Sequence, residues 1–227
     1  MESRISIFFD LDGTLCDPHD GIVRCLKYTL EQLGHATPPD EGLARYIGPP
    51  LHQSLAALLK SKDTELVKRA VELYRERFVS KGMFENTLYA GIPEALRKLK
   101  TEHYQLHVVT SKPAVFARQI VAHFGLERLF HKIYGSELDG TRADKSDLIA
   151  HVLEQEQIIP SEAVMVGDRE HDIKGALANG VQPIGVLWGY GSRKELTKAG
   201  ASVLCATPEC LSDTLSLNTR KNKSTLR

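Results

Sequence analysis

The chain alternates between short apolar runs and longer stretches of helical periodicity. Residues 5–9 form an apolar run rich in β-branched and aromatic side chains, which predicts a buried strand. Similar runs predict further strands over residues 105–110, 130–135, 163–166, 182–188 and 202–205. Apolar residues spaced three to four positions apart predict the intervening helices over residues 93–102, 113–124, 145–156, 172–179, 193–199 and 208–217. Strands that alternate with helices form right-handed crossover units, so we predict an α/β fold with a doubly wound parallel sheet.

Residues 17–85 depart from this alternation, because their pattern predicts helices and no strand. Asp63 is the expected N-cap of the last of three predicted helices, which cover residues 19–34, 52–60 and 64–80. We therefore predict that residues 1–16 and 86–217 form the α/β core, and that the helical residues between them form a small cap domain inserted after the first strand. Residues 218–227 are polar without an apolar period, which predicts a disordered tail.

Composition narrows the classes of function. Lys plus Arg and Asp plus Glu number 29 each, so the formal net charge is zero and gives no support for a nucleic-acid partner or an acidic membrane surface. No apolar run approaches the ~20 residues that a membrane-spanning helix needs. The four cysteines have neither a Cys-x-x-Cys pair nor zinc-type spacing, which favours a reduced, cytoplasmic location. A monomer or a homodimer is the assembly that we expect.

Two acidic residues, Asp10 and Asp12, follow the first predicted strand and precede Gly13 and Thr14. Side chains two apart on an extended chain point to the same side, and open α/β sheets place their sites at the carboxyl ends of strands. Two carboxylates this close repel each other unless they share a cation or a proton, and Mg²⁺ with oxygen ligands meets this need. An ordinary Asp-Gly turn after a strand is the alternative interpretation, and this stretch alone leaves both open.

Polar groups also mark the end of the second predicted core strand and the start of a later helix. The hydroxyls of Thr110 and Ser111 at a strand-to-helix junction suit a phosphate oxygen, although Thr and Ser are equally common as N-caps. Lys145 at the start of a helix opposes the helix dipole, and a function that needs a cation would explain this exception. A cap at Asp144 beside a merely exposed Lys145 is the alternative.

The strand over residues 163–166 ends in Gly167-Asp168, and Asp172 follows four residues later. We expect both acids to share one helix face, where they are unfavourable without a cation; a turn Asp and a helix-start Asp are the alternative. Because the carboxyl ends of parallel strands meet at one edge of a sheet, these acids converge there with Asp10, Asp12, Thr110 and Lys145. A carboxylate nucleophile, a phosphate clamp, a lysine and metal-holding acids together form a phosphoryl-transfer site.

This constellation resembles the haloacid dehalogenase superfamily of phosphohydrolases. The four motifs of that superfamily are similar, in order, to Asp10-Leu11-Asp12-Gly13-Thr14, Thr110, Lys145, and Gly167-Asp168 with Asp172. The resemblance implies a Rossmann-like core with a small α-helical cap after the first strand. Four other sequence segments resemble the phosphoglycolate phosphatase-like branch of the superfamily: residues 47–51, 109–113, 135–140 and 188–191. Some members of that branch are 5′-nucleotidases.

The same resemblance implies a magnesium-dependent phosphatase that works through an aspartyl-phosphate. In that mechanism Asp10 attacks the phosphorus and Asp12 moves protons, while Thr110 and Lys145 hold the phosphoryl oxygens. The metal ligands that it implies are Asp10, the backbone carbonyl of Asp12, Asp168 and, directly or through water, Asp172. Asp172 has a second possible role, which is to orient Lys145.

The cap is expected to select the substrate and to close over the site, which excludes water. The expected substrate-binding residues are Thr110, Ser111, Lys145, Gly48 and Pro49. Residues 48–50 are the expected specificity loop, with Arg45 or His52 as a candidate substrate contact and a solvated cap surface as the alternative for both. Residues 16–18 and 89–91 are candidate hinges.

Several substrates are compatible with this chemistry. Phosphoglycolate or a similar small phosphate ester comes first, and a nucleoside monophosphate second. A sugar phosphomutase would need cap groups that hold an intermediate, and no residue demands them. A dehalogenase is disfavoured by Asp12 and by the acidic fourth motif. A non-catalytic binding module on the same fold is disfavoured because the chain retains Asp10, Asp12, Lys145 and Asp168.

Overall fold

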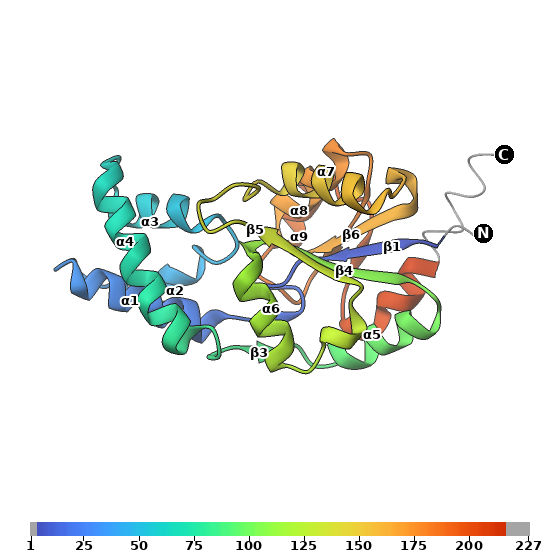
Figure 1. Ribbon diagram of the computed structural model, residues 1–227, viewed down its shortest axis with the longest axis horizontal. Helices are drawn as coiled ribbons and strands as arrows, with labels where there is room; N and C mark the ends of the chain where they lie inside the picture. Colours follow the sequence, from blue (N-terminus) through green and yellow to red (C-terminus); the bar gives the residue numbers. More distant parts are fainter. Residues whose placement is uncertain (1–3, 217–227) are drawn as a thin grey trace.

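The computed structural model describes residues 4–216, and a six-stranded sheet lies at the centre of the molecule (Figure 1). Its strands are β1 (Ser6–Phe9), β4 (Gln105–Pro113), β5 (Lys132–Ser136), β6 (Ala163–Gly167), β7 (Gln182–Val186) and β8 (Leu204–Cys205). The spatial order is β5-β4-β1-β6-β7-β8, and every neighbouring pair is parallel. The chain therefore winds from β1 toward β5 and then, in the other direction, from β6 toward β8. This reversal confirms the predicted doubly wound α/β fold and places a ligand crevice at the carboxyl end of β1.

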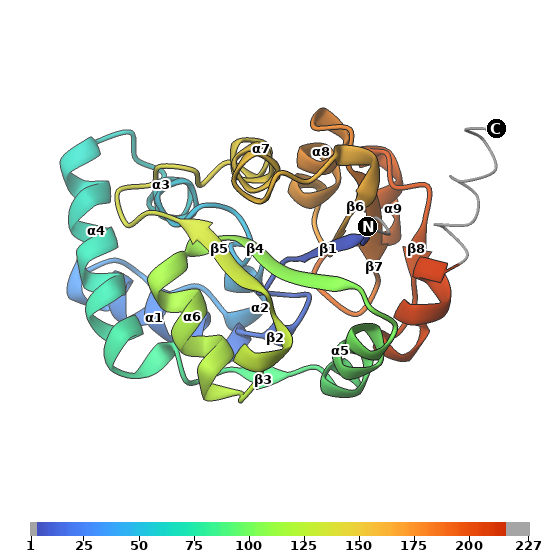
Figure 2. The same cartoon turned by 45° about the vertical axis from the view of Figure 1, so that its right-hand side comes forward.

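Helices cover both faces of the sheet (Figure 2). They are α5 (Ile92–Thr101), α6 (Ala114–His123), α7 (Lys145–Glu156), α8 (Glu170–Ala178) and α9 (Arg193–Ala199). Successive side chains of β1 pack into different layers: Ile7 and Phe9 belong to the core formed with α5 and α6, whereas Phe8 belongs to the core formed with α7. Because both faces are covered, the strand is apolar at every one of these positions.

The residues between β1 and α5 form a group of helices that lies to one side of the sheet (Figure 1). This helical segment, residues 17–85, contains α1 (His19–Gln32), α2 (Asp40–Ala44), α3 (Leu51–Leu59), α4 (Thr64–Arg77) and the π-helical turn η1 (Phe78–Gly82). Asp63 is the predicted N-cap of α4, since its carboxylate accepts hydrogen bonds from the backbone N–H groups of Glu65 and Leu66. The division of the chain into a core and a cap domain stays a prediction.

The expectation that residues 17–85 contain no strand is wrong at one end. Asp17 belongs to β2 (Cys16–Asp17), which pairs antiparallel with β3 (Thr87–Leu88). The two chain crossings between the sheet and the helical segment thus lie side by side and satisfy each other's backbone hydrogen bonds. Strands of two residues are too short to leave an alternating pattern in the sequence.

Other differences concern the ends of elements. The helix predicted over residues 64–80 changes at Phe78 into the π-helical turn, and α2 has five residues and was not predicted. Residues 208–216 are helical, beginning with a 3-10 turn over Pro208–Cys210. The predicted tail, residues 218–227, lies outside the described residues. Among residues 4–216, no helix is both long and apolar enough to cross a membrane.

Candidate active site

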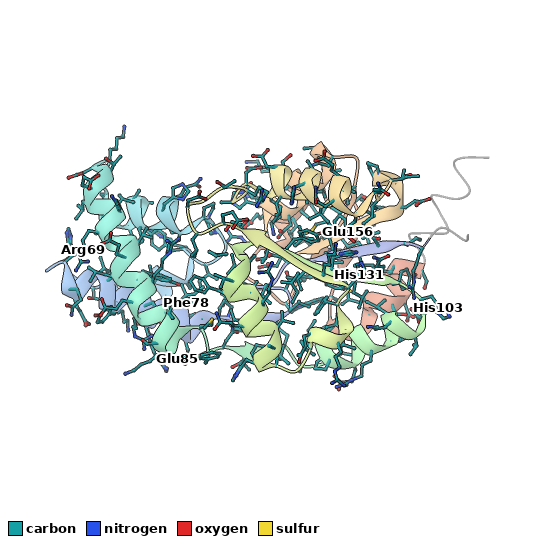
Figure 3. The ribbon with its side chains drawn as sticks, viewed as in Figure 1. Arg69, Phe78, Glu85, His103, His131 and Glu156 are labelled. Atoms are coloured by element: carbon teal, nitrogen blue, oxygen red, sulfur yellow. The ribbon has the colours of Figure 1, made fainter. Side chains whose placement is uncertain are left out.

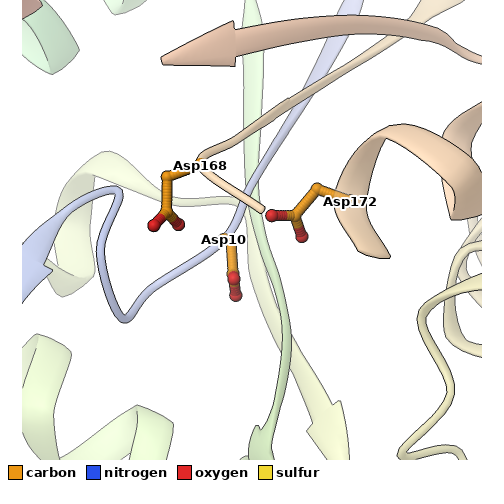
Figure 4. A group of neighbouring side chains, drawn as sticks. All are labelled: Asp10, Asp168 and Asp172. Carbon is orange, nitrogen blue, oxygen red and sulfur yellow. The ribbon is translucent and has the colours of Figure 1, made fainter. Parts of the chain in front are cut away.

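Three buried carboxylates meet at the carboxyl ends of β1 and β6 (Figure 4). They belong to Asp10, Asp168 and Asp172, and one oxygen of each lies within 4.8 Å of one oxygen of the others. Asp10 directly follows β1, Asp168 follows β6, and Asp172 lies in the first turn of α8. The expectation that Asp168 and Asp172 share a helix face is wrong, because α8 begins at Glu170 and Asp168 lies in the turn before it.

Lys145 supplies the positive charge of this cluster. Its Nζ lies 3.0 Å from Asp10 Oδ1 and 2.8 Å from Asp172 Oδ1, and it donates a hydrogen bond of 3.0 Å to the carbonyl of Val109. Burial alone would lower the pKa of Lys145, but the two carboxylates outweigh burial and raise it above its usual value. Asp144 caps α7 as expected, accepting from the Ser146 N–H at 2.8 Å, but the alternative of an exposed Lys145 beside it is wrong, because Lys145 is buried.

Asp168 is held by groups from two other turns. It accepts hydrogen bonds from the Thr14 hydroxyl at 3.1 Å and from the Tyr190 N–H at 2.8 Å. Gly13 adopts a φ of +82°, and a Cβ there would lie 2.3 Å from Asp168 Oδ2, so this approach requires glycine. Burial raises the pKa of Asp168 to about 8, and the charges of Asp172 and Asp10 add to the shift. The single charge of Lys145 therefore does not neutralise all three carboxylates of the cluster.

Asp12 faces a different partner, the ammonium group of Lys112, with which it forms a close ion pair. Burial raises the pKa of Asp12, and Lys112 opposes the shift. Asp12 Oδ1 is buried and has no hydrogen-bond partner within residues 4–216. Lys112 was not among the expected site residues. The signal for it was its position two residues beyond Thr110, on the same side of an extended chain.

A cavity of about 560 Å³ opens above these residues, between the sheet and the helical segment. The predicted site residues in its wall are Asp10, Asp12, Thr110, Ser111, Gly48, Pro49 and His52. Arg45 is not part of the described wall and instead donates to the Tyr46 hydroxyl at 2.9 Å. Lys112 joins the two sides, because its Nζ lies 5.1 Å from the ring centre of Phe78, a residue of the helical segment that is labelled in Figure 3.

The carboxylate cluster fits a hard divalent cation. Its donor atoms are oxygens, which such cations prefer. The pKa of Asp168 is raised first by burial and then by the negative charges of Asp172 and Asp10, and a bound cation would offset both effects. The residues that would hold the ion are Asp10, Asp168 and Asp172. Whether Asp12 contributes its backbone carbonyl stays a prediction.

Comparison with known proteins decides the family. The haloacid dehalogenase-like hydrolases match residues 7–186, a span that begins in β1, ends with β7 and includes every acidic residue of the cluster. The chain belongs to this family. Membership confirms the resemblance inferred from the four motifs and confirms that this haloacid dehalogenase-like protein is a hydrolase.

Individual relatives carry different names. A 5′-nucleotidase of Pseudomonas aeruginosa is 46% identical over 88% of this chain and 90% of its own length. The tyrosine-protein kinase PtkA of Mycobacterium tuberculosis is 38% identical over 89% of this chain and 69% of its own. A phosphoglycolate phosphatase of Colwellia psychrerythraea is 27% identical over 88% and 92%. The crystal structure of a predicted phosphatase from Clostridium acetobutylicum superimposes with a TM-score of 0.89 at 40% identity, covering 94% of this chain and 99% of that one.

Proposed function

We propose that this haloacid dehalogenase-like hydrolase is a magnesium-dependent phosphatase that hydrolyses a phosphate monoester through an aspartyl-phosphate on Asp10. The observation that carries the proposal is the placement of Lys145 at 3.0 Å from Asp10, which belongs to the buried cluster of three carboxylates and also lines the cavity. A nucleophile, a fixed cation and a set of metal ligands are the parts that phosphoryl transfer requires. Relatives named as phosphatases support the same activity.

The first half of the reaction uses both aspartates of the first motif. Asp10 Oδ1 is held by the Leu11 N–H at 2.8 Å and by Lys145, so Oδ2 is the oxygen that attacks the phosphorus. The bond between phosphorus and the ester oxygen breaks as the new bond forms, and protonated Asp12 gives its proton to the leaving oxygen. The raised pKa of Asp12 suits a carboxyl group that must carry a proton near neutral pH.

The second half returns the enzyme to its starting state. Asp12, now a carboxylate, takes a proton from a water molecule whose oxygen attacks the phosphorus of the aspartyl-phosphate. The bond between Asp10 and phosphorus breaks, and inorganic phosphate leaves. Thr110 and Lys145 hold the phosphoryl oxygens in both steps. Bound Mg²⁺ would supply positive charge beside the phosphoryl group, so that a dianion can approach the carboxylates.

The cavity favours a phosphate ester with a large, flat leaving group over phosphoglycolate. A volume of about 560 Å³ suits a ligand far larger than phosphoglycolate. Its wall away from the carboxylates includes the apolar and aromatic side chains of Tyr46, Val71, Tyr74, Phe78 and Phe116. Arg75 also lines the cavity, and its Nε is buried without a hydrogen-bond partner among the described residues. A nucleoside monophosphate, with a planar base that carries acceptor atoms, matches this wall best.

We expect kcat/KM for nucleoside monophosphates to exceed that for phosphoglycolate at least ~10-fold, because only the larger leaving group fills the apolar wall. Arg75→Met should lower the nucleotide value ~10-fold and leave turnover of acetyl phosphate unchanged. Steady-state assays of released phosphate with Mg²⁺ measure both effects. Arg69→Met is the matched control, since Arg69 lies on the same helix with 58% of its side chain exposed (Figure 3). Faster hydrolysis of phosphoglycolate than of every nucleotide would contradict this assignment.

Magnesium binding is expected to tighten as the pH rises. The pKa of Asp168 is about 8 in the folded, metal-free protein, against 3.8 for an unperturbed side chain, so a cation must displace a proton below pH 8. The apparent Kd should fall by up to ~10-fold per pH unit between about pH 6 and 8 and then level off. By the same linkage, metal-free protein loses stability as the pH rises from 3.8 to about 8, because over this range folded Asp168 keeps a proton that the unfolded chain releases. Titration calorimetry in two buffers of different ionisation enthalpy measures the released proton; a Kd independent of pH would refute the argument.

We also propose a cytoplasmic location and a small-molecule substrate. All four cysteines are free, and Cys16, Cys25 and Cys205 are buried as apolar side chains, which is typical of a reducing compartment. A monomer or a homodimer remains the expected assembly.

A further inference from the structure

One arginine connects the carboxylate cluster to the helical segment. Arg169 follows Asp168 directly, and its backbone N–H donates to the Asp172 carboxylate at 3.1 Å. Its side chain leaves the cluster and crosses to the helical segment, where Nη1 donates a hydrogen bond of 2.7 Å to the carbonyl of Ile47. The main chain of Arg169 is thus part of the carboxylate cluster, while its guanidinium group binds a turn more than a hundred residues earlier in the sequence.

The guanidinium group is fixed from the opposite side by Glu195 of α9. Nε of Arg169 donates to Glu195 Oε1 at 2.9 Å, and the same oxygen accepts from the Glu170 N–H at 3.0 Å. The exposed fractions of the two side chains are 17% and 24%, so solvent screens this pair only in part. A planar guanidinium with one edge held in this way presents its other N–H groups in a set direction, which an ammonium group does not do.

The turn that Arg169 binds lies close against the guanidinium. Gly48 has a φ of +106°, and a Cβ there would lie 3.1 Å from Arg169 Nη1, so a larger residue would strain the backbone and crowd the contact. This turn, residues 46–50, contributes Tyr46, Gly48, Pro49 and Pro50 to the wall of the cavity. Two prolines make it stiff, so a shift at the Ile47 carbonyl moves the turn as a unit.

We propose that Arg169 is a positioning residue that sets the distance between the carboxylate cluster and the wall of the cavity formed by residues 46–50. The inference rests on the proposed phosphatase function. A substrate that spans both regions must place its phosphoryl group at Asp10 and its leaving group against the turn at the same time. A tether between the two regions keeps both contacts compatible, and a displacement of about 1 Å costs on the order of 100-fold in rate.

The proposal separates large substrates from small ones. Nucleoside monophosphates reach from Asp10 to the turn, whereas the small leaving group of acetyl phosphate stays near the carboxylates. Loss of the tether should therefore lower turnover of nucleotides and spare turnover of acetyl phosphate. A contribution of Arg169 to folding alone, or to the shape of the metal site alone, would lower both activities by the same factor.

The test compares Arg169→Met and Arg169→Lys with the unchanged protein, and Arg193→Met, an exposed arginine of α9, is the matched control. For Arg169→Met we expect kcat/KM for a nucleoside monophosphate to fall ~30-fold, with a rise in KM, and kcat/KM for acetyl phosphate to stay within ~3-fold. The lysine variant should lie between the two, because one ammonium group cannot keep both contacts. The magnesium concentration for half-maximal activity should not change.

Hydrogen exchange provides a readout that does not depend on catalysis. In Arg169→Met, backbone amides of residues 46–56 should exchange faster, while amides of α7 keep their protection. Equal losses for both substrates, no loss for either, or unchanged exchange over residues 46–56 would overturn the proposal. If the unchanged protein hydrolyses neither substrate, the proposed function fails, and the exchange measurement still decides whether Arg169 tethers the turn.

Discussion

Asp10→Asn is expected to lower kcat/KM for every phosphate monoester by at least ~10⁴-fold while the fold stays intact. An amide has the shape of the carboxylate but lacks the anionic oxygen that attacks phosphorus. Its oxygen can still accept the hydrogen bonds that Oδ1 accepts from the Leu11 N–H and Lys145 Nζ. The variant also loses one of three carboxylates for the metal, so the assay needs a titration of Mg²⁺ to saturation.

Release of p-nitrophenol from its phosphate ester, measured with Mg²⁺ and with a chelator, gives the activity. Thermal unfolding checks that the variant is folded. Asp20→Asn is the matched control, because it makes the same chemical change at a side chain that is 62% exposed and pairs with Arg24 on the surface. Turnover by Asp10→Asn within tenfold of the unchanged protein would show that another group attacks the phosphorus.

The strands of the sheet could be predicted because both faces of the sheet are covered. Ile7, Phe8 and Phe9 are fully buried, although they point into two different layers, so the run is apolar without interruption and easy to recognise. The polar residues that follow each run then lie at one edge by the geometry of a parallel sheet. Lys145 and Asp10 lie 3.0 Å apart although 135 positions separate them in the sequence, and this proximity follows from topology alone.

The partner of Asp12 could not be predicted in the same way. Asp10 and Asp12 both line the cavity, but β1 ends at Phe9 and the chain turns, with the Leu15 N–H donating to the Leu11 carbonyl at 2.9 Å. Asp12 therefore faces Lys112, outside the carboxylate cluster. The two-residue alternation of side chains holds only within a strand, whereas the site residues follow the ends of the strands.

Contacts between the sheet and the helical segment could not be predicted from the sequence either. Arg169 and Ile47 are 122 residues apart, and nothing in the local pattern of either stretch indicates the other. Periodicity reports which side of an element is buried, not which element covers it. The same reason explains why Arg45 was a candidate for the cavity and Arg75 was not, since both are polar residues of the helical segment, whose packing the sequence leaves open.

Lys145→Met is the second change with a large expected effect, because it removes the charge that Asp10 and Asp172 share inside the protein. Lys145 is 4% exposed, so water cannot replace its ammonium group. Removing one partner of a buried ion pair costs about 3–5 kcal/mol, and we expect a loss of this size in the free energy of unfolding at pH 8 without metal. Activity should fall at least ~10³-fold, since the same ammonium group holds phosphoryl oxygens.

The pH dependence of this loss distinguishes buried charge from lost packing. Without Lys145 the carboxylate of Asp172, whose pKa burial already raises, is more stable protonated, so the deficit should shrink as the pH falls from 8 toward about 5. Saturating Mg²⁺ at pH 8 should also restore part of the stability, because the cation replaces the missing charge. Urea unfolding with and without Mg²⁺ measures both effects, and Lys174→Met, at a lysine 59% exposed and paired with Glu170, should change the free energy by less than about 1 kcal/mol. A deficit in Lys145→Met that is equal at both pH values and insensitive to Mg²⁺ would mean that the methylene chain of Lys145, rather than its charge, stabilises the site.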